Sequence, residues 1–362
     1  MKAAIITAFD PFTHRSGIER YTLHLADLLR GKKFSVDIFH TGLIDHDLGF
    51  YNKMLGKLYA LGRNFREIDQ NYDFVISNSF YGLGYFPPRI KAFNIYHSSH
   101  VTFDKSTENI IPHITSLKWS YLCGYLGEMV SGFNRTKIAV SDAVKEQLER
   151  YYSFEGVRVV ESGIDVSFFK KRGNRNILRK RYGVPEGAFV GLFVGRWDKT
   201  KGSDIVKNLM TRAANIFWLI VLSSGSNECS LENVKNAMVL KEVPYEEMPD
   251  IYSLSDFMFF PSRYEGFGLV VIEAMACGLP VMTGEIGVAK KIYGKEPFLR
   301  LRLPDFLITE EEFYAKSLEK IYFMKREDGF RRYIAEEGRR IVEEEYTLSR
   351  WRERMTKALD LS

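Results

Sequence analysis

The chain has 362 residues, of which 45% are hydrophobic and 27% charged, and its formal net charge is +5 at pH 7. This composition is typical of a folded, soluble protein and excludes a disordered one, and the length suits two domains better than one core. Basic residues are interleaved with acidic ones along the chain, which argues against nucleic acid as a partner.

The cysteines and the apolar runs indicate in which cellular compartment the protein is expected. Cys123, Cys229 and Cys277 are too widely spaced for a disulfide framework or a metal knuckle. The first nine residues, MKAAIITAF, are too short for the apolar region of a signal peptide, and no apolar run reaches transmembrane length. We therefore expect a cytoplasmic protein. No two histidines have a metal-ligand spacing on one helix, so we predict no zinc site.

The first elements have the order strand, loop, helix. Residues 3–9 predict a buried strand, 10–16 a loop, and Gly17 the start of an amphipathic helix. The first such loop of a doubly wound sheet commonly meets the phosphates of a ligand. Residues 35–40 predict a second strand. For the amphipathic stretch 50–68 a core-facing helix is favoured over a membrane-surface or acceptor-binding helix.

Residues 73–77 and 93–96 predict two further parallel strands. The second runs into His97 and His100, at the carboxyl edge where such sheets bind ligands. A lone histidine at this position more often has a structural role, so His97 is a candidate site residue and His100 a weaker one. Residues 119–133 predict a packed helix and 137–140 a strand, with Ser141 as the N-cap of the next helix.

The second half opens with a basic run at residues 170–181, for which solvated surface is favoured over phosphate or lipid binding. A predicted strand at 189–194 is followed by Gly195, Arg196 and, after a turn, Lys201 and Gly202. Arginine offers a planar fork and lysine a point charge, so these two cations could clamp a diphosphate. Because there is no Walker sequence and no G-x-G-x-x-G fingerprint, kinase and dehydrogenase activities lose their main support.

The stretch 259–280, FFPSRYEGFGLVVIEAMACGLP, predicts a buried strand, a glycine-bearing loop and a helix in direct succession. Glu265 lies just before the helix, where the free backbone N–H groups of residues 267–269 favour an anion. Gly266 and Gly268 let a ligand approach the backbone. Glu273 lies within the helix, where two neighbouring sugar hydroxyls could donate to its carboxylate. Taken singly, Glu265 could be a helix-start carboxylate and Glu273 a core-edge residue paired with an arginine.

The remaining elements continue the alternation of strands and helices. Further strands are predicted at 217–223, 238–243 and 281–283, a helix at about 245–253, two amphipathic helices within 309–345, and a last helix in 346–361.

With its flanking residues, the stretch 259–280 closely resembles the E-x7-E signature of the retaining glycosyltransferases of family 4. Glu265 and Glu273 stand at the two motif positions, and other segments match in order over most of the chain. The resemblance implies an α/β fold of two facing, Rossmann-like, doubly wound parallel-sheet domains (GT-B), with a cleft between them and a C-terminal helix that crosses back to the first. The implied domains are residues 1–168 plus 345–362, which bind the acceptor, and 169–344, which bind the nucleotide sugar.

The resemblance also assigns roles to individual residues. Arg196 and Lys201 match the arginine and lysine that hold the donor diphosphate, and Glu265 would hold donor-sugar hydroxyls. Glu273 would hold the ribose, and His97 matches the family's active-site histidine. The backbone of Val243 would lie near the nucleobase. The other implied donor-binding positions are Gly17, Phe267, Gly268 and Leu269.

Two positions depart from the family pattern. Ser16 stands where a glycine pair is usual, so only Gly17 carries over. Ser162 replaces the asparagine usual before Gly163.

The implied activity is retaining transfer of a hexose-type sugar from a nucleotide-diphosphate sugar to a hydroxyl acceptor, in glycan, lipopolysaccharide or glycolipid biosynthesis. The family needs no metal or cofactor, and the leaving phosphate takes the acceptor's proton. The expected partners are the nucleotide-sugar donor and a glycan or lipid-linked acceptor, with possible peripheral association at the inner face of a membrane. The alternatives are an inverting transferase with Asp10 or His97 as base, a nucleotide-sugar epimerase, and a non-catalytic nucleotide-sugar binder. These residues do not distinguish UDP, GDP or ADP, or one acceptor from another.

Overall fold

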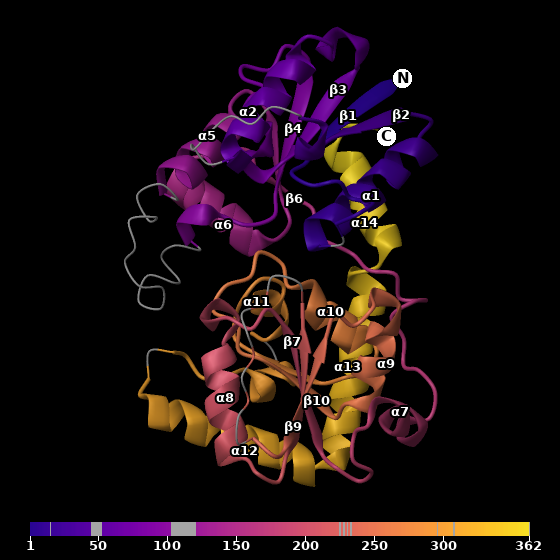
Figure 1. The fold of residues 1–362 in the computed structure, drawn as a ribbon, viewed down its shortest axis with the longest axis vertical. Helices are drawn as coiled ribbons and strands as arrows, with labels where there is room; N and C mark the ends of the chain where they lie inside the picture. The colour runs from indigo at the N-terminus through magenta and orange to yellow at the C-terminus, as the bar shows by residue number, and fades with distance from the viewer. Residues whose placement is uncertain are drawn as a thin grey trace. The chain divides into compact units, whose positions relative to one another are not determined.

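The computed structural model of the protein describes residues 1–14, 16–44, 53–102, 121–223, 226, 229, 231, 234–294, 296–306 and 308–361. They form two compact units: unit 1 comprises residues 1–161 and 352–362, and unit 2 comprises residues 162–351. Each unit is an α/β structure built on one parallel sheet (Figure 1). The predicted fold class, two parallel-sheet domains, is therefore confirmed.

The two crossings of the chain between the units lie beside each other at residues 162–164 and 346–348. Ile164 forms a parallel bridge with Thr347 and donates its N–H to the carbonyl of Tyr346 at 2.8 Å. A Cβ atom on Gly163 would lie 2.4 Å from the Thr347 oxygen, so this close approach requires glycine. Both segments lie in unit 2, which spans residues 162–351, whereas the implied second domain spans 169–344.

The sheet of unit 1 has six parallel strands in the order β2-β1-β3-β4-β5-β6. Its strand order reverses beside β1, where β1 pairs with β2 on one side and with β3 on the other. Ligands of doubly wound sheets bind at such a reversal, beyond the carboxyl ends of the strands. The strands are β1 (Lys2–Ile6), β2 (Ser35–Phe39), β3 (Phe74–Asn78), β4 (Lys91–Tyr96), β5 (Thr136–Ala139) and β6 (Arg158–Val159).

Helices from the first part of the chain cover this sheet, and the C-terminal segment returns to add one more. The described α-helices are α1 (Gly17–Gly31), α2 (Lys53–Arg66), α5 (Gly127–Gly132) and α6 (Asp142–Tyr152), together with the end of α14 (Leu348–Ala358). Ser141 caps α6 as predicted, because its hydroxyl accepts the N–H of Val144. Of the packed helix predicted at 119–133, residues 119 and 120 lie outside the described residues.

Helix α2 forms most of the amphipathic stretch 50–68, for which a core-facing helix was predicted over a membrane-surface or acceptor-binding one. Residues 50–52 lie outside the described residues. Leu58, Leu61 and Phe65 are at most 1% exposed. Leu61 and Phe65 belong to a core cluster with residues of β1 and β3, such as Ala4 and Val75. The core-facing interpretation is confirmed for these side chains.

The sheet of unit 2 has five parallel strands in the order β11-β10-β7-β8-β9. The chain runs outward from β7 to β9 and then returns to the other side of β7, so the strand order reverses between β7 and β10. The loops that follow these two strands are therefore neighbours at the carboxyl edge. The strands are β7 (Val190–Gly195), β8 (Phe217–Leu222), β9 (Ala237–Lys241), β10 (Phe257–Phe260) and β11 (Val281–Thr283).

The helices of unit 2 lie on both faces of its sheet (Figure 1). They are α7 (Arg175–Tyr182), α8 (Ser203–Arg212), α9 (Met248–Leu254), α10 (Leu269–Ala276), α11 (Ala289–Ile292), α12 (Glu310–Arg326) and α13 (Asp328–Glu345), with the start of α14. The two helices predicted within 309–345 are α12 and α13.

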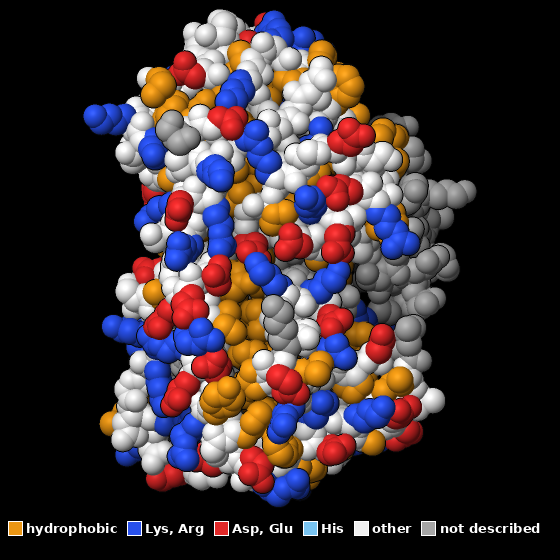
Figure 2. All heavy atoms as spheres, turned by 180° about the vertical axis from the view of Figure 1, so that it is seen from behind, with side chains coloured by type: hydrophobic (Ala, Val, Ile, Leu, Met, Phe, Trp, Pro, Cys, Tyr) orange, Lys and Arg blue, Asp and Glu red, His pale blue; other side chains and the backbone are white. Residues whose placement is uncertain are grey.

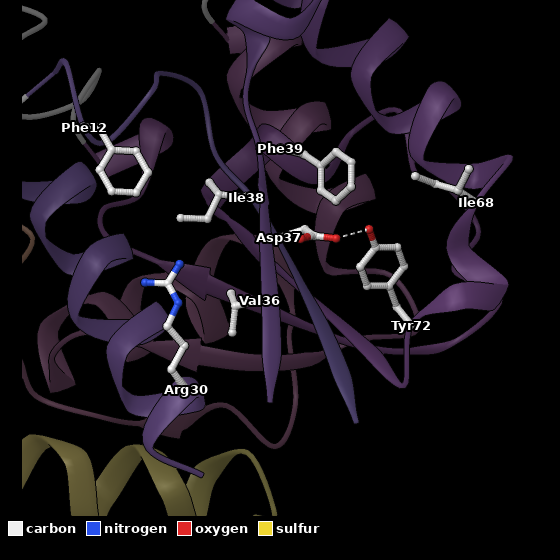
Figure 3. A pocket seen from close by; sticks show the side chains of 8 residues that line it. All are labelled: Phe12, Arg30, Val36, Asp37, Ile38, Phe39, Ile68 and Tyr72. Atoms are coloured by element: carbon white, nitrogen blue, oxygen red, sulfur yellow. Dashed lines mark hydrogen bonds between the residues drawn. The ribbon is translucent and has the colours of Figure 1, made fainter. Parts of the chain in front are cut away.

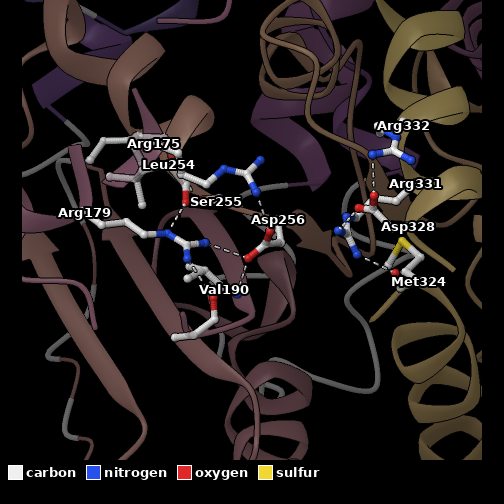
Figure 4. A network of polar contacts seen from close by, with 12 residues as sticks. Arg175, Arg179, Val190, Leu254, Ser255, Asp256, Met324, Asp328, Arg331 and Arg332 are labelled. Atoms are coloured by element: carbon white, nitrogen blue, oxygen red, sulfur yellow. Dashed lines mark hydrogen bonds and ion pairs between the residues drawn. The ribbon is translucent and has the colours of Figure 1, made fainter. Parts of the chain in front are cut away.

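Part of the basic run at 170–181 has a structural role. Arg179 and Arg175 donate to the two carboxylate oxygens of Asp256 at 2.8 and 2.7 Å, and Asp256 also accepts the N–H of Val190 at 2.8 Å (Figure 4). Asp256 is 5% exposed. The network fastens α7 to the starts of β7 and β10.

Basic and acidic side chains are interspersed over the face drawn in Figure 2. A groove follows the edge strand β2 of unit 1, where its lining side chains lie on both sides of the strand (Figure 3). It contains none of the predicted site residues. The lining residues are Phe12, Arg30, Val36, Asp37, Ile38, Phe39, Ile68 and Tyr72. No helix among the described residues is both long and apolar enough to cross a bilayer.

Candidate active site

The turn after β7 presents the two predicted clamp cations. Asp198 caps the short 3-10 helix Lys199–Lys201, because its side chain accepts the N–H of Lys201 at 3.1 Å. Arg196 is held by the other oxygen of the same carboxylate, 3.0 Å from its Nε, and its side chain is 44% exposed. Asp198 therefore orders the turn and orients Arg196, while leaving the guanidinium accessible.

The loop after β10 lies directly against this turn. Gly202 has φ 78°, and a Cβ atom there would be 2.3 Å from the carbonyl oxygen of Pro261. This contact brings two predicted site residues together: Lys201 Nζ is 2.5 Å from Glu265 Oε1, and their side chains are 22% and 13% exposed. The adjacency of β7 and β10 thus pairs a cation from one loop with a carboxylate from the next.

The start of α10 supplies the backbone positions that the sequence indicated. Gly268 is the N-cap with φ 88°, a left-handed conformation that favours glycine, and no side chain caps the helix. Phe267 is buried, and its carbonyl accepts the N–H of Val288 at 2.8 Å. Leu269 is the first helical residue, so its N–H is among those that lack an intrahelical acceptor.

Glu273 lies one turn further along α10 and is 3% exposed. Its Oε2 accepts the hydroxyl of Tyr252 on α9 at 2.9 Å. Burial, reinforced by the Glu273 charge, raises the pKa of Tyr252 well above its usual value, so the phenol keeps its proton. The half-buried Val243 follows the end of β9 in the same unit.

Gly17 and His97 belong to unit 1, and the other predicted site residues belong to unit 2. Gly17 is the first residue of α1 and follows the N-cap Ser16, whose hydroxyl donates to Glu19. Position 17 therefore has the helix-start geometry expected from the sequence.

His97 follows β4 and is held by groups from two other elements. Its Nε2 is 2.8 Å from Oδ1 of Asn78, the last residue of β3, and the edge of Tyr21 packs against its ring at 4.8 Å between centroids. The Asn78 amide nitrogen donates to Thr22 at 3.1 Å, so its oxygen faces the histidine. Burial lowers the pKa of His97 to about 3. The imidazole is therefore neutral near pH 7.

Sequence reasoning missed several residues that hold the site. Asn78 directly follows the strand predicted at 73–77, but its contact with His97 depends on β3 and β4 being neighbours in the sheet. Tyr252 carried no signal in the sequence, since its contact with Glu273 is defined only by the packing of α9 against α10. The described residues include no group of three or more histidine, cysteine, aspartate or glutamate side chains placed to hold a metal.

The two parallel-sheet α/β units have the architecture of the GT-B class of folds. Residues 174–340 match the family model described as glycosyl transferases group 1, and residues 15–168 match that of glycosyltransferase family 4. The chain belongs to glycosyltransferase family 4.

Curated relatives match part of the chain. It is 34% identical over 155 residues to D-inositol 3-phosphate glycosyltransferase 1 of Catenulispora acidiphila, covering 37% of this chain and 36% of the relative. It is 31% identical over 181 residues to the D-inositol 3-phosphate glycosyltransferase of Streptomyces bingchenggensis, covering 44% and 40%. Each match spans less than half the length of the relative.

Solved structures match the whole chain in fold. Sucrose-phosphate synthase from Thermosynechococcus elongatus superposes with a TM-score of 0.81 at 19% identity, covering 99% of this chain and 98% of that one. Anabaena Alr3699/HepE, solved in complex with UDP-glucose, superposes with a TM-score of 0.72 at 17% identity, covering 100% of both chains. At such low identity these neighbours establish the fold alone.

Proposed function

We propose that the protein is a retaining glycosyltransferase that moves a hexose-type sugar from a nucleotide-diphosphate sugar to a hydroxyl acceptor. The observation that carries the proposal is the 2.5 Å contact between Lys201 and Glu265, with Arg196 on the same turn as the lysine. A diphosphate needs cations and a sugar needs hydrogen-bond acceptors for its hydroxyls. These residues supply both groups at one point of the sheet edge.

The chemistry follows from where charge develops. When the bond between the anomeric carbon and the donor phosphate breaks, negative charge builds on the bridging phosphate oxygen. Arg196, Lys201 and the N–H groups at the start of α10 would stabilise that charge, and preorganised electrostatic stabilisation is usually the largest contribution to lowering a barrier. Glu265 would hold hydroxyls of the donor sugar and Glu273 those of the ribose.

The properties of His97 favour the retaining proposal over an inverting transferase with this histidine as base. Since burial lowers the pKa of His97 to about 3, its imidazole is a weak base near neutral pH. We assign it instead the role of a neutral hydrogen-bonding group. The leaving phosphate would then take the acceptor's proton on the same face of the sugar. Asp10 remains the possible base of an inverting alternative, which the anomeric configuration of the product would distinguish.

The names of similar proteins suggest which substrates to test first. The Anabaena neighbour was solved with UDP-glucose, and the curated relatives are named as inositol-phosphate glycosyltransferases. We therefore propose UDP-glucose as the first donor, and glycan or glycolipid biosynthesis in the cytoplasm, possible also at a membrane surface, as the setting. We propose that no metal is required.

The first test replaces the clamp cations. Arg196→Ala and Lys201→Ala should each lower transfer on the order of 10²-fold or more, because each removes a preorganised group from the developing phosphate charge.

Donor binding is measured separately, by the thermal stability of the protein with UDP, GDP, ADP and their sugar conjugates in the presence of a metal chelator. A ligand at about a hundred times its dissociation constant adds roughly 2.7 kcal/mol to the folded state.

Arg212→Ala is the control, because Arg212 lies at the far end of α8 and pairs with Glu311. Near-normal turnover in both clamp variants would contradict the proposal. The anomeric configuration of the product, read by NMR, separates retention from inversion. Consumption of donor without any acceptor would instead indicate an epimerase.

A further inference from the structure

The loop that carries Glu265 is tied to the clamp turn a second time, through Arg263. Its guanidinium forms a two-pronged ion pair with Asp204, with Nη1 to Oδ1 and Nη2 to Oδ2 both at 2.8 Å. The same Nη1 donates to the carbonyl of Lys199, and the backbone N–H of Arg263 donates to the carbonyl of Thr200 at 2.9 Å. Arg263 therefore contacts both the turn after β7 and the first turn of α8.

The two ion pairs join the same two segments side by side. Arg263 lies two residues before Glu265, and Asp204 lies three residues after Lys201. The Arg263 side chain is 16% exposed and that of Asp204 is 35% exposed. Phe306 also covers the guanidinium, which lies 5.4 Å from the centre of its ring. A bidentate arginine–carboxylate pair fixes both distance and orientation, which a lysine–carboxylate contact does not.

The two pairs must behave differently when a donor binds. In the proposed function the ammonium of Lys201 moves to the diphosphate and the carboxylate of Glu265 moves to sugar hydroxyls, so their direct contact has to open. The proposed function assigns neither Arg263 nor Asp204 a contact with the donor. Their pair can therefore persist while the other one opens.

We propose that Arg263 is a positioning residue, which keeps Glu265 in register with Lys201 through its ion pair with Asp204 while the donor separates them. This inference rests on the proposed function. A misplacement of about 1 Å in a catalytic constellation can cost on the order of 10²-fold in rate. Loss of the Arg263–Asp204 pair should therefore reduce transfer more than it reduces stability.

The chain provides a closely matched control at the other end of α8. Arg212 forms a bidentate pair with Glu311, with both bonds at 2.8 Å, and its guanidinium lies 4.6 Å from the ring centre of Tyr314. Both arginines thus bind a carboxylate with two bonds beside an aromatic ring. Only Arg263 contacts the segments that carry Lys201 and Glu265.

The experiment compares Arg263→Gln, Asp204→Asn and Arg263→Lys with Arg212→Gln in the full chain. The probes are UDP and UDP-glucose, with the GDP and ADP pairs if these fail to bind the unmodified protein. Calorimetry measures affinity, steady-state kinetics give kcat and KM, and Tm reports stability. We expect Arg263→Gln and Asp204→Asn to lower kcat/KM about 100-fold, Arg263→Lys to recover part of this loss, and Arg212→Gln to leave it unchanged.

A double-mutant comparison separates positioning from general stability. In a Lys201→Ala background there is no lysine left to keep in register, so adding Arg263→Gln should cost less than about threefold further, since residues that act as a unit are strongly non-additive. A full additional 100-fold loss, or equal effects of Arg263→Gln and Arg212→Gln on kcat/KM, would overturn the inference and leave the proposed function standing. If the unmodified protein binds none of these nucleotides, the proposed function fails, and this inference fails with it.

Discussion

His97 is held neutral by burial and oriented by the side chain of Asn78. Its pKa is lowered from 6.5 to about 3. Between these values the unfolded chain binds a proton that the folded protein does not. Stability is therefore complete above about pH 6.5 and falls as pH drops toward 3, with a slope of up to about 1.4 kcal/mol per pH unit.

His97→Gln should remove this dependence, so the difference in unfolding free energy between about pH 7 and pH 5 becomes smaller than in the unmodified protein. Denaturant unfolding, followed by a probe in unit 1, measures the difference. The exposed His14 provides the control, His14→Gln. An equal pH dependence in His97→Gln and the unmodified protein would show that His97 titrates normally.

Glu273 offers a second residue-scale test, because the two ends of its hydrogen bond can be changed separately. Glu273→Gln should raise the dissociation constant for the nucleotide about tenfold or more, since a hydrogen bond from a ribose hydroxyl to a carboxylate is stronger than one to an amide. Tyr252→Phe removes the 2.9 Å bond but keeps the carboxylate, and should mainly lower stability, by about 1 kcal/mol. Unchanged nucleotide affinity in Glu273→Gln would remove the ribose assignment.

These residues also mark the limit of what the sequence could predict. Arg196, Lys201 and Glu265 were named from residue type, spacing and resemblance, because such motifs are local. Asn78 lies 19 residues before His97, and the two meet only because β3 and β4 are neighbours. The burial that sets the pKa of His97 is a property of packing, which no local pattern reports.

At the scale of elements, the site depends on strand order rather than on the strands themselves. Continuous apolar runs predicted β7 and β10. They did not predict that the chain returns after β9 so that β10 pairs with β7. Only that pairing brings Lys201 to Glu265 across 64 residues of chain. In the same way, the charges of the run at 170–181 predicted solvated surface, whereas Arg175 and Arg179 bind the buried Asp256.

Gly202→Ala tests the close approach of the two loops. The added Cβ would lie 2.3 Å from the Pro261 oxygen and would sit at φ 78°. We expect destabilisation of about 1–3 kcal/mol together with reduced transfer, because the clamp turn must move away from the loop of Glu265. Tm and kcat/KM measure the two effects.

Gly183→Ala is the matched control for this substitution. Gly183 has φ 71°, and its only close neighbour in the described chain is a methionine methyl group at 3.4 Å. It therefore carries the same backbone strain without the collision, and transfer should be unchanged. If the two variants lose transfer equally, the contact between Gly202 and Pro261 has no role in the site.

At the scale of the whole molecule, the alternation of strands and helices and the 362-residue length sufficed to predict two α/β domains. The return of the chain to unit 1 came from the resemblance alone, since a terminal amphipathic helix does not reveal where it packs. In the structure the last residues are part of the core of unit 1: Met355 and Leu359 are fully buried. Asp360 pairs with Arg158 at 2.9 Å and with Lys91 at 3.3 Å.

Unit 1 should therefore depend on a residue almost 200 positions beyond its main segment. Leu359→Ala should destabilise it by about 2–5 kcal/mol, the usual cost of deleting a buried leucine side chain. Hydrogen exchange measured by mass spectrometry should show faster exchange in β4 and β5, while β7 and β8 in unit 2 keep their protection. Asp360→Asn is the control: it removes only the exposed ion pairs and should change exchange little. Equal loss of protection in both sheets would mean that the units unfold together, and no loss in β4 and β5 would mean that the C-terminal segment does not stabilise unit 1.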